Sequence, residues 1–470
     1  MSTISPQNQV PLAGHGLRRT GPGGLPSSPI SLLLCGGGTG GHVYPALAVA
    51  SALAIRFSRA EEPGKPVGDG YPPDLAGEQQ VEGPAAQGAL KVRQPRAEGE
   101  EPEHLGLLPH GRGSEGGTLH LVYVGSIGGM EQAIVERESA LPFRAIRAAA
   151  VRGRGPIQLA RSAGAIAAGI RQAHKLLREE RPAAILGTGG YVCVPLFLAA
   201  RALRVPTMIY LPDIVPGLAV RSLAPIAARV ACSFEPSLQW LPRSKTIVTG
   251  YPVRPEIAQL DRRQSRRELG LSGMWPVLLV YGGSRGARSI NRAIQQLLAP
   301  LLEVCEILHI CGREGDEAFL RAAAETLPED LRGRYHLHPY LQGTMPQALV
   351  AADLAICRAG ASTLAELPAA GLPAVLIPLS HVHQDENAAY LTERGAAVTV
   401  ADGEMLGSGS PVDGPLFQVV KRLLTDREEL TAMGARSRAL ARLDAADRLA
   451  DALLELAGWG TVNRQDAKKR

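Results

Sequence analysis

Two strand-like segments of the chain each end in a turn of small residues that leads into a helix. Residues 31–57 pass from the apolar run SLLLC through GGGTGGH into VYPALAVASALAIRF, and residues 277–288 read VLLVYGGSRGAR. This order is typical of doubly wound α/β domains, whose ligands bind outside the carboxyl ends of parallel strands. The two openings therefore predict two such domains, each with a ligand site at its turns.

Apolar runs alternate with helical stretches along most of the chain, which predicts parallel sheets with crossover helices. The expected strands are 31–35, 119–124, 183–187, 207–211, 230–234 and 246–250, followed by 277–283, 306–311, 353–357 and 374–378. A chain of this length suits two domains of about 150–200 residues each. We place the first domain at 30–250 and the second at 251–458, joined near GYPVRPE and facing each other across a cleft.

Three segments lack a sustained apolar period. Residues 1–29 are rich in Gly, Pro, Ser and Gln, and residues 59–118 are dominated by Gly, Pro, Glu and Gln. Such segments bury too little apolar surface to offset the entropy cost of ordering. We expect 1–29 to be disordered, 59–118 to be a disordered insertion after a first helix at about 43–57, and the tail at 459–470 to be loose.

The composition narrows the classes of function. A formal net charge of +5 suits an anionic ligand or a membrane surface, and 4% aromatic residues leave little for base stacking, so we expect no nucleic-acid partner. The six cysteines form no C-x-x-C pair and lie mostly in or beside apolar runs, which predicts reduced, buried thiols. We find no apolar run long enough to span a membrane and no signal-peptide pattern.

The first turn matches G-x-G-x-x-G, but charged positions that the known nucleotide motifs need are absent. A dinucleotide site requires an acidic residue where this chain has Val124-Gly125-Ser126, and a P-loop requires Lys where it has His42. What remains is a set of bare amides at a helix N-terminus, which suits an anion. The alternative is a turn whose glycines serve packing alone. Similar turns at 187–191, 282–286 and 358–363 together favour a phosphate-bearing ligand of some length.

Seven ordered motifs resemble those of the MurG family of glycosyltransferases. They are GGTGGHVYPALAVA, LGTGGYV, GYPVR, GGSRGAR with Asn291, CRAGASTLAE, AAGLP and HQDENA, between about residues 31 and 458. The resemblance implies a GT-B fold, with two Rossmann-like domains facing across a cleft, the acceptor on the first and the UDP-sugar on the second. It also implies an inverting transfer of N-acetylglucosamine from UDP-GlcNAc to undecaprenyl-linked lipid I, giving lipid II for peptidoglycan. The enzyme is then expected to be peripheral, at the cytoplasmic face of the bacterial membrane.

The donor side must stabilise a departing diphosphate. We find no Asp-x-Asp pair in the globular parts, so we expect no metal and no cofactor, and we expect amides and cations to meet the charge instead. The turn Ser284-Arg285-Gly286 fits this role, and Arg254 offers a guanidinium, with an interdomain salt bridge as its alternative. The resemblance also places Arg254 and Ser284 in the donor site.

The resemblance assigns further donor contacts: Glu366 to the ribose hydroxyls, His383-Gln384 and Asn387 to the sugar hydroxyls, and the backbone of Leu341 to the uracil. From the residues alone, Thr363-Leu-Ala-Glu366 is also a capping-box pattern, and 383–387 is also a solvated helix start. The expected substrate-binding residues are Thr39, Gly40, Gly41, Gly189, Gly190, Tyr191, Arg254, Ser284, Arg285, Gly286, Leu341, Ala361, Ser362, Thr363, Glu366, His383, Gln384 and Asn387.

Two residues are expected to carry the catalysis. His42 is the ionisable group of the first turn, and its ordinary pKa suits a proton acceptor near neutrality; its alternatives are a donor to the acceptor diphosphate and a structural histidine. The chain departs from the family at YLPDIVPG, where H-E-Q-N-x-x-x-G is common: Leu211 replaces the glutamate and Asp213 the asparagine. Asp213 is a second candidate base, or orients His42.

Residues 152–178 combine an apolar stripe with basic residues. The stripe is formed by Leu159, Ala163, Ile166, Ile170, Ala173 and Leu177, and the basic residues are Arg152, Arg154, Arg161, Arg171, Lys175 and Arg178. This pattern suits a helix seated on anionic inner-leaflet lipid. The alternative is a core-facing helix with a solvated basic face.

Two other functions remain open at this stage. One is a related lipid glycosyltransferase, for example one that acts on diacylglycerol. The other is a non-catalytic UDP-sugar-binding protein that lost its base at Leu211.

Overall fold

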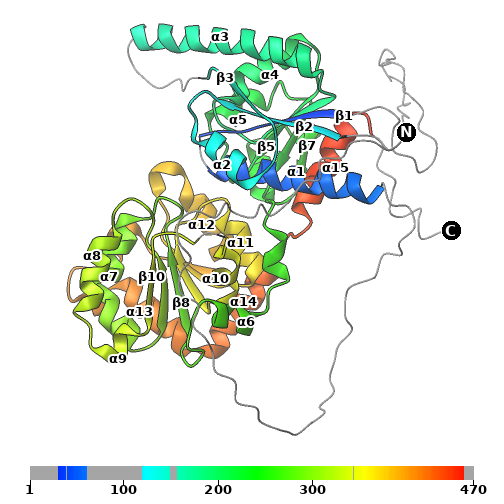
Figure 1. Ribbon diagram of the computed structural model, residues 1–470. Helices are drawn as coiled ribbons and strands as arrows, with labels where there is room; N and C mark the ends of the chain where they lie inside the picture. Colours follow the sequence, from blue (N-terminus) through cyan, green and yellow to red (C-terminus); the bar gives the residue numbers. More distant parts are fainter. Residues whose placement is uncertain (1–29, 39, 61–118, 149–155, 342, 460–470) are drawn as a thin grey trace, which may run out of the picture.

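A computed structural model of the protein describes residues 30–38, 40–60, 119–148, 156–341 and 343–459. The expected disordered N-terminus, nearly all of the expected insertion and nearly all of the expected loose tail lie outside these residues. The described chain forms two α/β domains, one above the other in Figure 1.

The first domain is built on a seven-stranded parallel sheet in the order β3-β2-β1-β4-β5-β6-β7. Its strands are β1 (Ile30–Cys35), β2 (Leu119–Ser126), β3 (Phe143–Ile146), β4 (Ala184–Gly187), β5 (Thr207–Leu211), β6 (Arg229–Cys232) and β7 (Thr246–Val248). Its helices are α1 (Gly40–Ala60), α2 (Met130–Glu138), α3 (Pro156–Glu180), α4 (Cys193–Ala202) and α5 (Leu218–Leu223). The strand order reverses between β1 and β4, which is where doubly wound sheets bind ligands.

The second domain repeats this plan with a six-stranded parallel sheet in the order β10-β9-β8-β11-β12-β13. Its strands are β8 (Val277–Tyr281), β9 (Glu306–Ile310), β10 (Tyr335–His338), β11 (Leu354–Cys357), β12 (Ala374–Leu376) and β13 (Ala397–Thr399). Its helices are α6 (Arg262–Glu268), α7 (Arg288–Leu302), α8 (Glu317–Glu325), α9 (Glu329–Arg332), α10 (Met345–Ala351), α11 (Thr363–Ala370), α12 (Gln384–Thr392), α13 (Pro415–Thr425) and α14 (Arg427–Ala439). The order reverses between β8 and β11.

The central strands are apolar on both faces because helices cover both sides of each sheet. In β1, Leu32 and Leu34 join one hydrophobic cluster, and Leu33 and Cys35 join the cluster on the opposite face. This explains why the expected strands read as continuous apolar runs. All six cysteines are buried and unpaired, which confirms the prediction of buried, reduced thiols.

Three strands were missed, namely β3, β10 and β13, and each is an edge strand. These three strands are paired on one side only and are less completely buried than the central strands, so they lack the continuous apolar run on which the prediction relied; the fourth edge strand, β7, was predicted. Helix α1 also extends to Ala60, so residues 59 and 60 are helical and do not belong to an insertion.

The last helix, α15 (Ala445–Leu456), lies in the range assigned to the second domain but packs on the first. Leu449 and Leu453 belong to the same hydrophobic cluster as α1, and the Phe57 and Trp459 rings stack with centroids 5.0 Å apart. Arg56 of α1 pairs with Asp447 of α15 at 3.0 Å. The chain therefore crosses back to the first domain at its end (Figure 1).

None of the helices described has both the length and the apolar character needed to cross a bilayer. Within the same described part of the chain, no cluster of three or more His, Cys, Asp or Glu side chains is arranged to hold a metal ion. The metal-free reaction stays a prediction.

Candidate active site

The four small-residue turns follow β1 and β4 in the first domain and β8 and β11 in the second, so each pair flanks a reversal of strand order. In the first domain the two turns touch: Gly37 N donates to Gly189 O at 3.2 Å, and the Thr188 hydroxyl donates to the carbonyl oxygen of His42. Gly190 has φ +86°, and a Cβ there would collide with the backbone of Gly37. Packing alone thus explains glycine at 190. Of the other predicted residues in these turns, Gly40 and Gly41 are the first two residues of α1, and Tyr191 is half-buried. Thr39 is not among the residues that the structure describes.

His42 lies in the first turn of α1, with its ring beside Gly189. Its Nδ1 is 2.9 Å from Gly37 O, and because a carbonyl only accepts, Nδ1 carries the proton. In the neutral ring, Nε2 then holds the lone pair. Burial lowers the pKa of His42 from its ordinary value, opposed by the Gly37 bond and by the charges of Asp213 and Glu131. A lowered pKa keeps the imidazole neutral, and so able to accept a proton, near pH 7.

Asp213 follows β5 and meets the second domain at Asn387 of α12. Asn387 Nδ2 donates to Asp213 Oδ1 at 3.1 Å and to Ala359 O at 2.9 Å, and its Oδ1 accepts from Ile214 N at 3.3 Å. Burial raises the pKa of Asp213, while the Asn387 bond and the charge of His42 lower it. Both N–H donors of Asn387 are therefore already used within the protein, and its bonds to Asp213 and Ile214 join the two domains.

Arg254 comes from the connection between the domains, and its guanidinium lies 5.6 Å from the ring centroid of Tyr44 on α1. It makes no ion pair with any residue in the described ranges, so the salt-bridge alternative is not what the structure contains. Its charge lowers the pKa of Glu366, as does the Ser362 hydroxyl, but burial dominates and the net shift is upward. Arg254 thus stands between α1 of the first domain and α11 of the second.

Helix α11 begins at Thr363 with Ser362 at its N-cap, so Thr363 is not the cap and the capping-box alternative for Glu366 fails. Ala361 and Thr363 are buried beside the helix start.

The turn after β8 is exposed at Ser284 and Arg285. Gly286 has φ +90°, and a Cβ there would collide with the Cys311 carbonyl, so this glycine lets the turn pack against the end of β9. Asn291 supports the same carbonyl with a 2.8 Å bond, and Arg285 pairs with Glu314 of the adjoining loop.

The remaining predicted donor residues lie on the second domain. Leu341 is half-buried against the domain core. His383 is exposed and has φ +60°, in the left-handed region that non-glycine residues adopt uncommonly; Arg181 and Arg204 share it. Gln384 Oε1 accepts from Leu379 N at 3.1 Å, which holds the side chain against its own loop.

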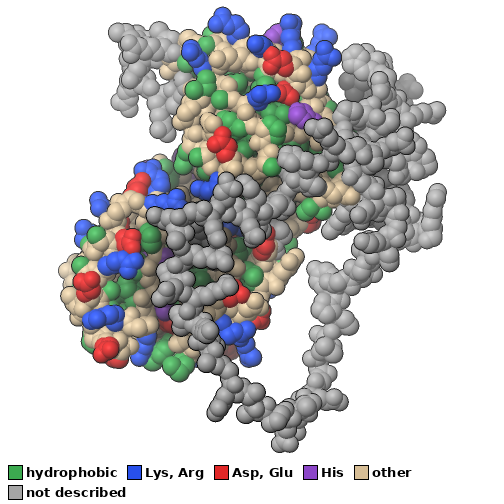
Figure 2. Space-filling view, in the orientation of Figure 1, with side chains coloured by type: hydrophobic (Ala, Val, Ile, Leu, Met, Phe, Trp, Pro, Cys, Tyr) green, Lys and Arg blue, Asp and Glu red, His purple; other side chains and the backbone are tan. Residues whose placement is uncertain are grey.

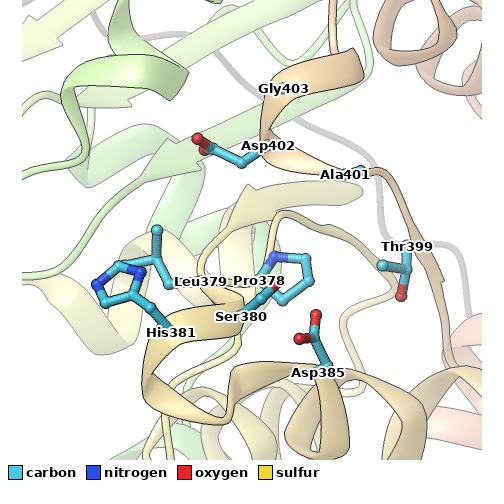
Figure 3. A pocket seen from close by; sticks show the side chains of 9 residues that line it. All are labelled: Pro378, Leu379, Ser380, His381, Asp385, Thr399, Ala401, Asp402 and Gly403. Carbon is cyan, nitrogen blue, oxygen red and sulfur yellow. The ribbon is translucent and has the colours of Figure 1, made fainter.

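A hollow of about 450 Å³ lies beside this loop, lined by Pro378, Leu379, Ser380, His381, Asp385, Thr399, Ala401, Asp402 and Gly403. In Figure 3 the loop that carries Asp402 bounds it on one side and the start of α12 with Asp385 on the other. None of the predicted site residues lines it.

The sequence reasoning missed Tyr44 and Glu131. Glu131, in α2, is fully buried, and its carboxylate lies against Gly37. Gly125 and Gly129 of GSIGGME, where a Cβ would collide with that side chain, were the available signal.

Two parallel sheets of this order, joined by a short connection and a returning final helix, form the GT-B fold. Residues 115–232 match the N-terminal domain of glycosyltransferase family 28, and residues 277–449 match its C-terminal domain. The chain belongs to this family, and within it to the MurG family.

The relatives agree in length as well as in sequence. A Roseiflexus UDP-N-acetylglucosamine–N-acetylmuramyl-(pentapeptide) pyrophosphoryl-undecaprenol N-acetylglucosamine transferase is 50% identical, over 95% of this chain and 98% of its own. The Desulforudis audaxviator enzyme of the same name is 36% identical, over 92% and 99%. The crystal structure of Acinetobacter baumannii MurG matches with a TM-score of 0.62 at 24% identity, over 91% of this chain and all of that one, which supports the fold.

Proposed function

We propose that the protein transfers N-acetylglucosamine from UDP-GlcNAc to undecaprenyl-linked lipid I, producing lipid II. The names of relatives that align along nearly the whole chain support this reaction. The observation that carries it is the contact between the domains. Asp213 of the first domain bonds to Asn387 of the second. Arg254, whose charge acts on Glu366, lies over Tyr44, two residues after His42 on α1. These contacts support a reaction centre between the domains, with the base on the first domain and the donor on the second.

In this proposal His42 is the general base. Its Nε2 takes the proton of the acceptor hydroxyl as the oxygen attacks the anomeric carbon of the donor sugar, and the bond to UDP breaks. The bond from Nδ1 to Gly37 O fixes the tautomer, and the nearby carboxylate of Asp213 stabilises the imidazolium that forms. Asp213 therefore acts on the base, and its own oxygen stays bonded to Asn387.

The donor would lie on the second domain. The exposed turn at Ser284 and Arg285 offers backbone amides to the diphosphate, Arg254 adds a cation, and Glu366 binds the ribose. The roles of Leu341, His383 and Gln384 toward uracil and sugar rest on the family resemblance.

Asp213→Asn is expected to shift the pH dependence more than the rate. Asparagine keeps an oxygen for Asn387 but removes the charge that raises the pKa of His42. The pKa of His42 then falls further, so the acid limb of kcat/KM moves to lower pH, and the plateau rate falls by no more than about tenfold. A loss of 100-fold or more without a shifted limb would instead make Asp213 the base. The measurement is a kcat/KM profile from pH 5 to 9.

Helix α3 offers a basic face to a membrane. In its described part, Ala173 and Leu177 are buried, so the apolar stripe packs inward there, as the core-facing alternative predicted. Arg171, Lys175 and Arg178 are exposed, and Figure 2 shows Lys and Arg gathered over this end of the first domain. We infer peripheral binding to anionic lipid on the cytoplasmic face, through charge.

Replacing Arg171, Lys175 and Arg178 together by Gln is expected to weaken binding to vesicles containing anionic phospholipid at least about tenfold, since each charge near the surface contributes about 1 kcal/mol. The matched control replaces Arg263, Arg422 and Arg427, which are exposed on the second domain. Equal loss in both variants would show that net charge, and not this face, binds the vesicles. Co-sedimentation measures the effect.

The direct test of the function is conversion of purified lipid I to lipid II with labelled UDP-GlcNAc. Label on diacylglycerol but not on lipid I would favour the related lipid glycosyltransferase. UDP-GlcNAc binding without turnover on either acceptor would favour a non-catalytic binding protein. The same assay with EDTA tests the metal-free reaction, for which we expect an unchanged rate.

A further inference from the structure

Glu131 is a carboxylate with no exposed surface, on the first turn of α2. It accepts from Ser126 N at 2.7 Å and from the Ser126 hydroxyl, and its other oxygen accepts from Gly38 N at 3.4 Å. No Lys or Arg of the described ranges pairs with it. A buried charge without a counter-ion lowers the stability of the fold. The mechanism proposed above gives Glu131 no role.

Glu131 and His42 are joined by a single peptide group, the one between Gly37 and Gly38. The carbonyl oxygen of this group accepts from His42 Nδ1 at 2.9 Å, and its N–H donates to Glu131 Oε2. An acceptor on the N–H of a peptide strengthens the carbonyl of the same peptide as an acceptor, because consecutive hydrogen bonds polarise one another. The carboxylate therefore favours both the Nδ1–H tautomer of His42 and its protonated form.

We propose that Glu131 is a positioning residue for His42, and that it acts on the imidazole through the Gly37–Gly38 peptide group. The proposal rests on the proposed role of His42 as the base. The local sequence is shaped around this carboxylate: a Cβ on Gly37 or Gly129 would collide with it. Of the residues that the structure describes, Glu131 from α2 and Asp213 from the loop after β5 both act on His42 through their charge and raise its pKa.

Glu131→Gln removes the charge and one acceptor while keeping the size of the side chain. We expect kcat/KM for lipid I to fall about fivefold to tenfold, the acid limb of its pH profile to move to lower pH, and the KM for UDP-GlcNAc to stay unchanged. Glu131→Asp keeps the charge, so its acid limb should stay near the wild-type position even if the rate falls. Glu136→Gln is the control, since Glu136 is exposed on the same helix.

A second readout does not depend on the acceptor. The C2–H resonance of His42, assigned by comparison with His42→Gln, is titrated by NMR in the free full-length protein. A lower midpoint in Glu131→Gln than in wild type and in Glu136→Gln supports the relay, even if lipid I proves to be the wrong acceptor. An unchanged midpoint overturns it, whatever happens to the rate. If Glu131→Gln does not fold, a wild-type midpoint and a reduced rate in Glu131→Asp support the proposal, and an unaltered rate in that variant opposes it.

Discussion

His42→Gln is expected to lower kcat/KM for lipid I at least about 100-fold, because a positioned general base contributes roughly 10²- to 10⁴-fold. Glutamine has a similar size but cannot take a proton near pH 7. The acid limb of the pH profile, which reports protonation of His42, should disappear with it. UDP-GlcNAc binding should persist, since the proposed donor contacts lie on the second domain and its connection.

The control for this variant is His120→Gln. His120 is an exposed histidine of the same domain, at the start of β2, where it pairs with Glu180 at 3.1 Å and lies at the opposite end of the strand from the turns. It should retain wild-type activity. If His42→Gln kept more than about a tenth of the rate with an intact fold, the base assignment would be wrong.

Arg254→Met is the second large effect that we expect. Losing a charged hydrogen bond to the donor diphosphate costs about 1.5–3 kcal/mol, which corresponds to roughly a 10- to 100-fold lower kcat/KM for UDP-GlcNAc. The KM for lipid I should change little. Arg254 also lowers the pKa of Glu366, so its removal should raise that pKa further. As the pH is lowered, Glu366 is then protonated earlier, and the affinity for UDP-GlcNAc should begin to fall at a higher pH than in wild type.

Arg263→Met, at an exposed position of α6, is the matched control. Arg254→Lys separates charge from shape: it should restore the pH dependence but only part of the affinity, because lysine lacks the planar two-pronged donor of arginine. Isothermal titration of UDP and of UDP-GlcNAc measures both effects. If Arg254→Met bound UDP-GlcNAc with wild-type affinity, Arg254 would have only a structural role at the domain connection.

Much of the fold was predictable because its central strands are buried on both faces. The runs that form β1, β4, β8 and β11 carry an unbroken apolar signal, and each leads into a small-residue turn. The edge strands β3, β10 and β13 gave no such signal. The return of α15 to the first domain was also not predictable, because an amphipathic helix does not indicate which of two cores it will cover.

Part of the candidate site was likewise predictable from local sequence, and part was not. His42 and the four turns were found from the sequence, since glycine turns at strand ends are a local pattern. Other features of the site depend on contacts between distant segments, which the sequence does not indicate. The Asn387 side chain bonds to Asp213 and Ile214, and Arg254 lies over Tyr44. Glu131 accepts a hydrogen bond from Gly38 in the first turn.

Short segments of the sequence were enough to predict the central strands, their turns and the family, because each of these depends on the order of residues within one segment. Contacts between distant segments set which side chains are partners across the domains, and therefore which groups shift the pKa of His42. Burial and neighbouring charge set a pKa, and both are properties of the packed molecule.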